Sequence, residues 1–246
     1  MLSYDNAVAV NGQTPASPTN ISGARTAVPT TSPKVTRVPV PAVSGTSDVH
    51  GQAMNGVQTN GQVAPVEHHI WLVTGPAGCG KSTVAKYLAV SLNLPYIEGD
   101  EYHPKANVEK MSNGIPLTDA DRWDWLTLLR EESLRLINAG HAGVVLTCSA
   151  LKKKYRDVIR VAPYFVPNLH LHFIYLSAPE EVLLRRVAAR PNHFMPPSMV
   201  ASQLSILEPP SEQEVDVISI DVTRPIEQVE AEALDRVLRT MDRVRQ

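Results

Sequence analysis

One motif constrains the fold of this chain more than any other sequence feature. Residues 75–82 read GPAGCGKS and match the pattern G-x-x-x-x-G-K-[ST]. The motif lies between the apolar run 70–74 and a stretch with helical spacing of apolar residues at 84–94. Such a loop turns backbone N–H groups toward phosphates, and the positive end of the following helix adds to the attraction. We predict a phosphate-binding loop in which Lys81 meets the transferring phosphoryl group and the Ser82 hydroxyl ligates Mg²⁺.

Further apolar runs alternate with helical stretches along the chain. The runs lie at 143–147, 170–176 and 217–220, and the helical stretches at 119–138, 151–160, 179–189 and 225–241. This alternation predicts an α/β fold with a parallel sheet covered on both faces. Thr118, with Asp121 three residues later, is the predicted cap of the helix after Leu117. His68 and His69 precede the first strand and are expected to be solvated.

The first 65 residues have a different composition from the rest of the chain. They are rich in Ser, Thr, Pro, Gly, Asn and Val and follow neither the helical nor the strand period. Ordering each residue costs about 1–2 kcal/mol of backbone entropy, and this composition offers little apolar surface to bury in return. We predict a disordered leader over 1–65 and a folded domain over 66–246.

Charge and composition exclude several classes of function. The net charge of −2 is not that of a nucleic-acid-binding protein, and no apolar run approaches the roughly 20 residues that span a membrane. The two cysteines, Cys79 and Cys148, make no disulfide framework, which indicates a reducing compartment, the cytoplasm. The GTPase pattern N-K-x-D is absent. These observations leave a small phosphotransferase as the leading class.

Acidic residues end a short predicted strand over 94–100. In a parallel sheet its carboxyl end opens on the same edge as the phosphate loop, so Asp100 can reach an acceptor hydroxyl as base or orienter. Glu98 is a candidate for the water shell of Mg²⁺. The alternative for Asp100 is a plain helix cap before Pro104.

Polar residues at helical spacing follow this strand. His103, Asn107 and Lys110 share one face of a helix that starts near Pro104, which suits a polyhydroxylated anionic acceptor or, alternatively, a solvated face. Arg122 is either a carboxylate clamp or a salt-bridged surface residue.

Basic residues mark two later segments. Lys152 and the weaker candidate Arg156 lie on one face of the helix after the run 143–147. Arg186 and Arg190 lie four residues apart before Pro191, and predict a mobile lid that brings positive charge onto the triphosphate. The alternative is a basic helix end favoured by the helix dipole.

Taken together, these motifs resemble those of the gluconokinase family of small P-loop kinases. The shared segments run in order from about 68 to 225, and only the phosphate loop is generic: His68–Ser82, EGDxxHP from Glu98, NxxKM from Asn107, GxPLxDxDRxxWL from Gly114, CSALKKxYRD from Cys148 and RxxxRxxHF from Arg186.

The resemblance implies a fold and an activity. It implies a doubly wound sheet of five parallel strands in a P-loop kinase domain over 66–246, and often a homodimer. It further implies transfer of the ATP γ-phosphate to the 6-hydroxyl of D-gluconate, with Mg²⁺ required. Met195-Pro196-Pro197 is stiffer than expected for the lid.

The resemblance also implies a set of site residues. The nucleotide contacts are Gly75, Pro76, Ala77, Gly78, Cys79, Gly80, Lys81, Ser82 and Thr83. Asp100 faces the acceptor hydroxyl, and the acceptor candidates are His103, Asn107, Lys110, Arg122, Lys152, Arg156 and His193. The open alternatives are a kinase for another small hydroxylated acid, such as a shikimate-type acceptor, and a non-catalytic ATP-binding module.

Overall fold

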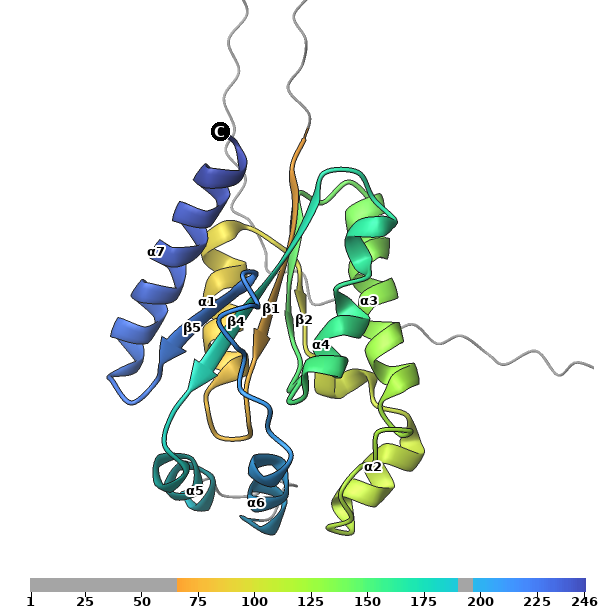
Figure 1. The fold of residues 1–246 in the computed structure, drawn as a ribbon, viewed down its shortest axis with the longest axis vertical. Helices are drawn as coiled ribbons and strands as arrows, with labels where there is room; N and C mark the ends of the chain where they lie inside the picture. Colours follow the sequence, from red (N-terminus) through yellow and green to blue (C-terminus); the bar gives the residue numbers. More distant parts are fainter. Residues whose placement is uncertain (1–65, 190–196) are drawn as a thin grey trace, which may run out of the picture. The chain divides into compact units, whose positions relative to one another are not determined.

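Five parallel strands form one sheet in the computed structural model, which describes residues 66–189 and 197–246 (Figure 1). The strand order is β2-β3-β1-β4-β5, with the phosphate-loop strand in the centre. This confirms the predicted doubly wound parallel sheet. The strands are β1 (His68–Thr74), β2 (Tyr96–Ile97), β3 (Gly143–Thr147), β4 (Leu169–Ser177) and β5 (Val217–Asp221).

Helices cover both faces of the sheet. Helices α1 and α7 pack on one face, and α3 and α4 on the other (Figure 1). The helices are α1 (Lys81–Leu92), η1 (Gly99–Tyr102), α2 (Lys105–Ser112), α3 (Trp123–Asn138), α4 (Lys153–Ile159), η2 (Ala162–Tyr164), α5 (Glu180–Ala188), α6 (Pro197–Ser205) and α7 (Ile226–Val244).

The central strand is apolar throughout because it is buried on both sides. Ile70 and Leu72 face the layer of α3 and α4, whereas Trp71 and Val73 face α1 and α7. All four are fully buried. The continuous apolar run therefore reflects two covered faces and the period of two in a strand.

The structure differs from the sequence-based expectations at His69 and at Thr118. His69 is not solvated: it belongs to β1, is 2% exposed and stacks on Trp71 of the same strand and on His170 of β4. Thr118 does not cap α3, whose N-cap is Arg122. Instead the Thr118 N–H and hydroxyl donate to Asp121 Oδ2 and close a separate turn before the helix.

Three predictions lie outside the described residues: the disordered leader 1–65, Arg190 and His193. The stiffness of the lid at Met195 and Pro196 lies outside them as well. Among the helices of residues 66–189 and 197–246, none combines the length and hydropathy that a membrane-spanning helix needs.

Candidate active site

The phosphate loop connects β1 to α1 and curls around its own lysine. The Lys81 ammonium donates to the carbonyls of Gly75, at 3.0 Å, and Pro76, at 3.1 Å. Gly75 has a φ of 138°, and a Cβ there would lie 2.7 Å from the Leu176 carbonyl oxygen. Gly80 has a φ of 96° at the N-cap of α1. Glycine is required at these positions because L side chains are strained at positive φ.

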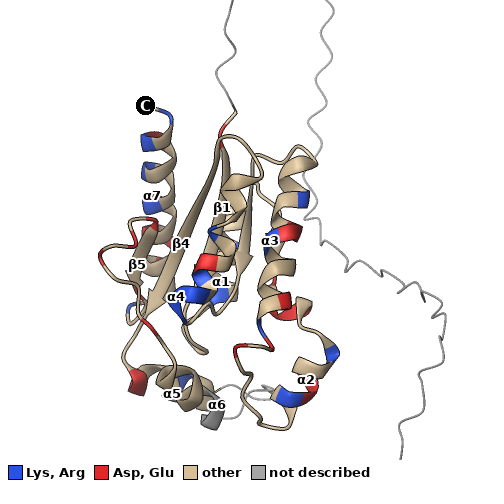
Figure 2. Cartoon of the chain, turned by 45° about the vertical axis from the view of Figure 1, so that its right-hand side comes forward, with Lys and Arg blue, Asp and Glu red and all other residues tan. Residues whose placement is uncertain are grey.

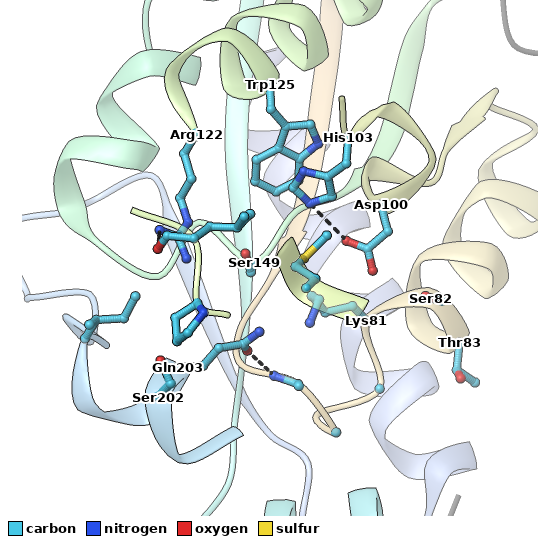
Figure 3. Close-up of a pocket in the computed structure, with 17 residues that line it drawn as sticks. Lys81, Ser82, Thr83, Asp100, His103, Arg122, Trp125, Ser149, Ser202 and Gln203 are labelled. Carbon is cyan, nitrogen blue, oxygen red and sulfur yellow. Dashed lines mark hydrogen bonds and ion pairs between the residues drawn. The ribbon is translucent and has the colours of Figure 1, made fainter. Parts of the chain in front are cut away.

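The loop forms one wall of a pocket at the carboxyl edge of the sheet (Figure 3). Nine of the predicted site residues line it: Ala77, Gly78, Gly80, Lys81, Ser82, Thr83, Asp100, His103 and Arg122. Eight further residues complete the lining: Met111, Pro116, Leu117, Trp125, Ser149, Ser202, Gln203 and Ile206. Cys79 does not line this pocket, because its side chain is buried behind the loop.

Asp100 lines the same pocket as the phosphate loop. It follows β2 in η1, and its side chain is 54% exposed. Its Oδ1 lies 4.0 Å from Nε2 of His103. A dashed line marks this contact in Figure 3. The same pocket therefore holds a carboxylate and the lysine of the phosphate loop, which is the arrangement that transfer to a hydroxyl needs.

His103 is fixed against an aromatic wall. Its side chain is only 5% exposed, and its ring stacks on that of Trp125 with centroids 4.0 Å apart. Burial, followed by the charge of Arg122, lowers the pKa of His103 to about 4. The imidazole is therefore neutral near pH 7, so that one ring nitrogen can donate a hydrogen bond and the other can accept one.

Arg122 presents a cation to the pocket. Its guanidinium donates to the carbonyls of Leu117 and Thr118, and lies 5.3 Å from the centre of the Tyr155 ring. These contacts hold the side chain in place through one terminal nitrogen and leave other N–H groups of the guanidinium for a ligand. A fixed guanidinium suits a carboxylate or phosphoryl group.

The two candidates on α2 lie outside the pocket lining. Asn107 is buried, and its amide donates to the Asp121 carbonyl at 2.7 Å. The Lys110 ammonium pairs with Asp121 Oδ1 at 2.6 Å. Both side chains attach α2 to the turn before α3, so they shape the pocket wall without lining it.

The two candidates at the start of α4 also make internal contacts. Lys152 pairs with Asp119 at 3.0 Å. Figure 2 shows Lys and Arg residues in blue on α4. Arg156 is 2% exposed and makes two hydrogen bonds of 2.7 Å to the Glu214 carboxylate. The structure thus places Arg156 in the core, because helical spacing alone does not reveal a partner 58 residues away.

Arg186 lies on α5 and donates to the Val222 carbonyl at 2.6 Å, just after β5. It is not among the residues that line the pocket. Its predicted contact with the triphosphate stays a prediction.

Helix α6 contributes residues that the sequence did not indicate. The Gln203 side-chain oxygen accepts a hydrogen bond of 2.8 Å from the Ala77 N–H of the phosphate loop, and Ser202 and Ile206 line the pocket beside it. No local motif marks this helix as part of the site. Only its packing against the loop brings it there.

The residues fit a magnesium ion that arrives with a nucleotide. Mg²⁺ takes oxygen ligands and is usually bound by one or two side chains together with substrate phosphates. In the described part of the chain, no cluster of three or more His, Cys, Asp or Glu residues holds a metal by itself. Ser82, at the start of α1, is the hydroxyl that would bind the ion.

Comparisons with known proteins show the family of this chain. The sequence matches the AAA domain family over residues 72–196. A probable gluconokinase of Schizosaccharomyces pombe is 50% identical over 170 residues, which cover 69% of this chain and 88% of that protein. The thermoresistant gluconokinase of Escherichia coli is 37% identical, covering 69% and 93%.

A solved structure matches as well. The crystal structure of a gluconokinase from Sinorhizobium meliloti aligns with a TM-score of 0.63 and 41% identity, and covers 73% of this chain and 96% of that one. The similarity thus covers most of this chain and nearly all of that one. The chain belongs to the gluconokinase family.

Proposed function

We propose that the protein transfers the γ-phosphoryl group of ATP to the 6-hydroxyl of D-gluconate, giving 6-phospho-D-gluconate and ADP. The observation that carries the proposal is the shared pocket of Lys81 and Asp100. Membership of the gluconokinase family supports the choice of acceptor. A non-catalytic ATP-binding module would not need a carboxylate facing the loop.

Each pocket residue has a chemical task in this reaction. Asp100 accepts the proton of the attacking hydroxyl, and neutral His103 beside it orients that hydroxyl. The N–H groups of the loop and the Lys81 ammonium stabilise the charge that develops on the phosphoryl oxygens. Arg122 binds the carboxylate of the acceptor. Mg²⁺, when bound, neutralises charge on the phosphates.

An acceptor panel tests the proposal. ADP release is measured with ATP and Mg²⁺ in the presence of gluconate, other sugar acids, shikimate or no acceptor. We expect gluconate to stimulate release far above the background rate, and the ³¹P and ¹³C NMR spectra of the product to show a phosphate ester at position 6. Stimulation by shikimate instead would favour another hydroxylated acid, and no stimulation at all would favour a binding module.

Three finer properties belong to the same proposal. The protein acts in the cytoplasm, which the two buried free thiols of Cys79 and Cys148 support. It acts on a small molecule and without nucleic acid or membrane, which the net charge of −2 supports. It forms a homodimer, as the family resemblance implies. Fractionation of cells and light scattering of the purified protein test these properties.

A further inference from the structure

The turn after β3 carries a serine that lines the pocket. Ser149 is half-buried, and in the view of Figure 3 it lies between Arg122 and Asp100, which line the same pocket. Its carbonyl oxygen accepts hydrogen bonds from the Thr74 hydroxyl, at 2.7 Å, and from the Gly75 N–H, at 3.4 Å. Within residues 66–189 and 197–246, the Ser149 hydroxyl has no such partner. The hydroxyl is therefore the group that this turn presents to a ligand.

The backbone of the turn is strained at the next residue. Ala150 has a φ of 36°, in the left-handed region that alanine rarely adopts. The other described residues with positive φ are glycines or the asparagines Asn93 and Asn168, residue types that tolerate this conformation. A strained backbone persists only where the surrounding structure holds it, and such positions are concentrated at active sites and ligand-binding sites.

Three consecutive carbonyl groups hold the turn in this conformation. The carbonyl of Ser149 is bound to the end of β1 and the start of the phosphate loop, as described above. The carbonyl of Ala150 accepts from the buried Arg156 guanidinium of α4 at 3.2 Å, and that of Leu151 accepts from the Glu208 N–H after α6 at 2.8 Å. The direction of the serine side chain is thus fixed by three separate elements of the fold.

We propose that Ser149 is an acceptor-binding residue whose hydroxyl forms a hydrogen bond with one hydroxyl group of gluconate between the carboxylate and position 6, and that the strained backbone at Ala150 positions it. The inference rests on the proposed function, in which Arg122 binds the carboxylate and Asp100 faces the 6-hydroxyl. Ser149 lies between these two side chains and therefore faces the middle of the acceptor. A serine hydroxyl can donate and accept, as the hydroxyl groups of a sugar acid can.

Two pairs of variants test the two parts of the inference. Ser149→Ala removes the hydroxyl, and Ser177→Ala removes a hydroxyl at the end of β4, outside the pocket lining, as its control. Ala150→Gly permits the left-handed backbone without strain, and Asn168→Gly makes the same change just before β4, at the amino end of the sheet. For each variant, Tm, kcat and the KM values for gluconate and for ATP are measured.

We expect Ser149→Ala to raise the KM for gluconate about 3- to 10-fold, the effect of losing one hydrogen bond, and to leave the KM for ATP unchanged. Ala150→Gly should also raise the KM for gluconate, because glycine lets the turn move, while its Tm stays equal to or above that of the unchanged protein. Ser177→Ala and Asn168→Gly should leave both KM values unchanged. Weaker acceptor binding without loss of stability is not expected of a turn that only supports the fold.

Deoxy analogues of gluconate identify the hydroxyl group that Ser149 contacts. Each analogue lacks one hydroxyl group between the carboxylate and position 6, and its KM is measured with the unchanged protein and with Ser149→Ala. For the analogue that lacks the partner of Ser149, the two proteins should have the same KM, because the hydrogen bond is then missing in both. For the other analogues the difference in KM should persist.

Three results would overturn the inference. The same KM for gluconate in Ser149→Ala and in the unchanged protein would show that the hydroxyl does not bind the acceptor. A difference that persists with every deoxy analogue would assign the hydroxyl to another group of the reactants. A lower Tm of Ala150→Gly with an unchanged KM would make the turn a structural element only. Failure of the proposed function is distinct from all three, because the unchanged protein itself would then not phosphorylate gluconate.

Discussion

The two ends of the central sheet bury imidazole rings in chemically opposite settings. At the carboxyl edge, His103 stacks on Trp125 and faces the Asp100 carboxylate. At the amino end, the rings of His69 and His172 stack on that of Trp71. Among the described residues, neither histidine has a carboxylate oxygen within the 4.0 Å that separates His103 from Asp100. Burial lowers the pKa of all three histidines to about 4. A shifted pKa by itself therefore does not mark a functional site.

The neighbours of each ring make the difference. Trp71 and His172 are cross-strand partners on β1 and β4, with ring centroids 4.4 Å apart. Like Nδ1 of His103, the atoms His69 Nδ1, Trp71 Nε1 and His172 Nε2 at the amino end have no hydrogen-bond partner among the described residues. These rings serve as packing surface, whereas the ring at the carboxyl edge shares a pocket with a phosphate loop. We infer that changes at the carboxyl edge alter the rate and changes at the amino end alter stability.

The largest expected effect tests the carboxyl edge. Asp100→Asn should lower kcat by about 10²–10⁴-fold, because a carboxamide accepts a proton far less readily than a carboxylate. Steady-state kinetics and Tm measure the outcome, with Asp242→Asn on α7 as the matched control. A loss of ATP affinity as large as the loss of kcat would instead indicate that Asp100 binds the nucleotide or the metal.

The next effect concerns a residue that the sequence assigned to the site and the structure places in the core. Arg156→Ala should lower the free energy of unfolding by about 3 kcal/mol, because it leaves the buried Glu214 with Arg160 as its remaining cationic partner. Urea unfolding measures the change, and activity is assayed well below the Tm. A large rise in the KM for gluconate with unchanged stability would contradict this prediction and indicate that Arg156 binds the acceptor.

A smaller effect tests the amino end through pH. The pKa of His69 and of His172 is about 4 in the folded protein and about 6.5 in the unfolded chain. Between these values the unfolded chain binds protons that the folded protein does not, so the free energy of unfolding decreases as the pH falls from 6.5 toward 4. Above pH 6.5 the two histidines contribute no pH dependence.

The variant His172→Phe tests the origin of that slope. It keeps an aromatic ring against Trp71 and removes one titrating group, so the decrease in Tm between pH 6.5 and 4 should become shallower. Asp119 and Asp121, whose pKa is held well below the usual range by hydrogen bonds from Lys154 and Lys110 respectively, act only at lower pH. An unchanged slope would mean that other groups set the acid stability.

The smallest effect is expected for Lys110→Met. Its side chain is 41% exposed, and its ammonium pairs with Asp121 outside the pocket lining. Such a pair contributes about 0–1 kcal/mol, and kcat/KM for gluconate should change less than about threefold. A tenfold rise in the KM for gluconate would place this lysine on the acceptor after all.

Several features could be predicted from the sequence because their causes are local. Residues 75–82 form a phosphate loop because Gly75 and Gly80 adopt positive φ angles at which other residues are strained. The strands were recognisable because β1 and β3 are buried on both faces and therefore read as apolar runs. The likeness of the ordered motifs to gluconokinases identified the family.

The polar residues of the site were harder to predict, because spacing reveals which residues share a helix face and not what that face meets. Asn107 and Lys110 share a face of α2, but His103, expected on the same face, precedes that helix. The face of Asn107 and Lys110 meets the turn at Asp121 and not the pocket lining. Gln203 had no motif at all, and reaches the loop from 126 residues away.

The sequence by itself determined the phosphate loop, the alternation of strands and helices and the family, since each depends on backbone preferences and apolar periods within short segments. Only the tertiary structure decided that Arg122 faces the pocket while Arg156 pairs in the core, and that Tyr96 and Thr147 hold Glu98. The physical reason is that a buried charge or hydroxyl takes its role from its partner, and the partners here come from distant segments of the chain.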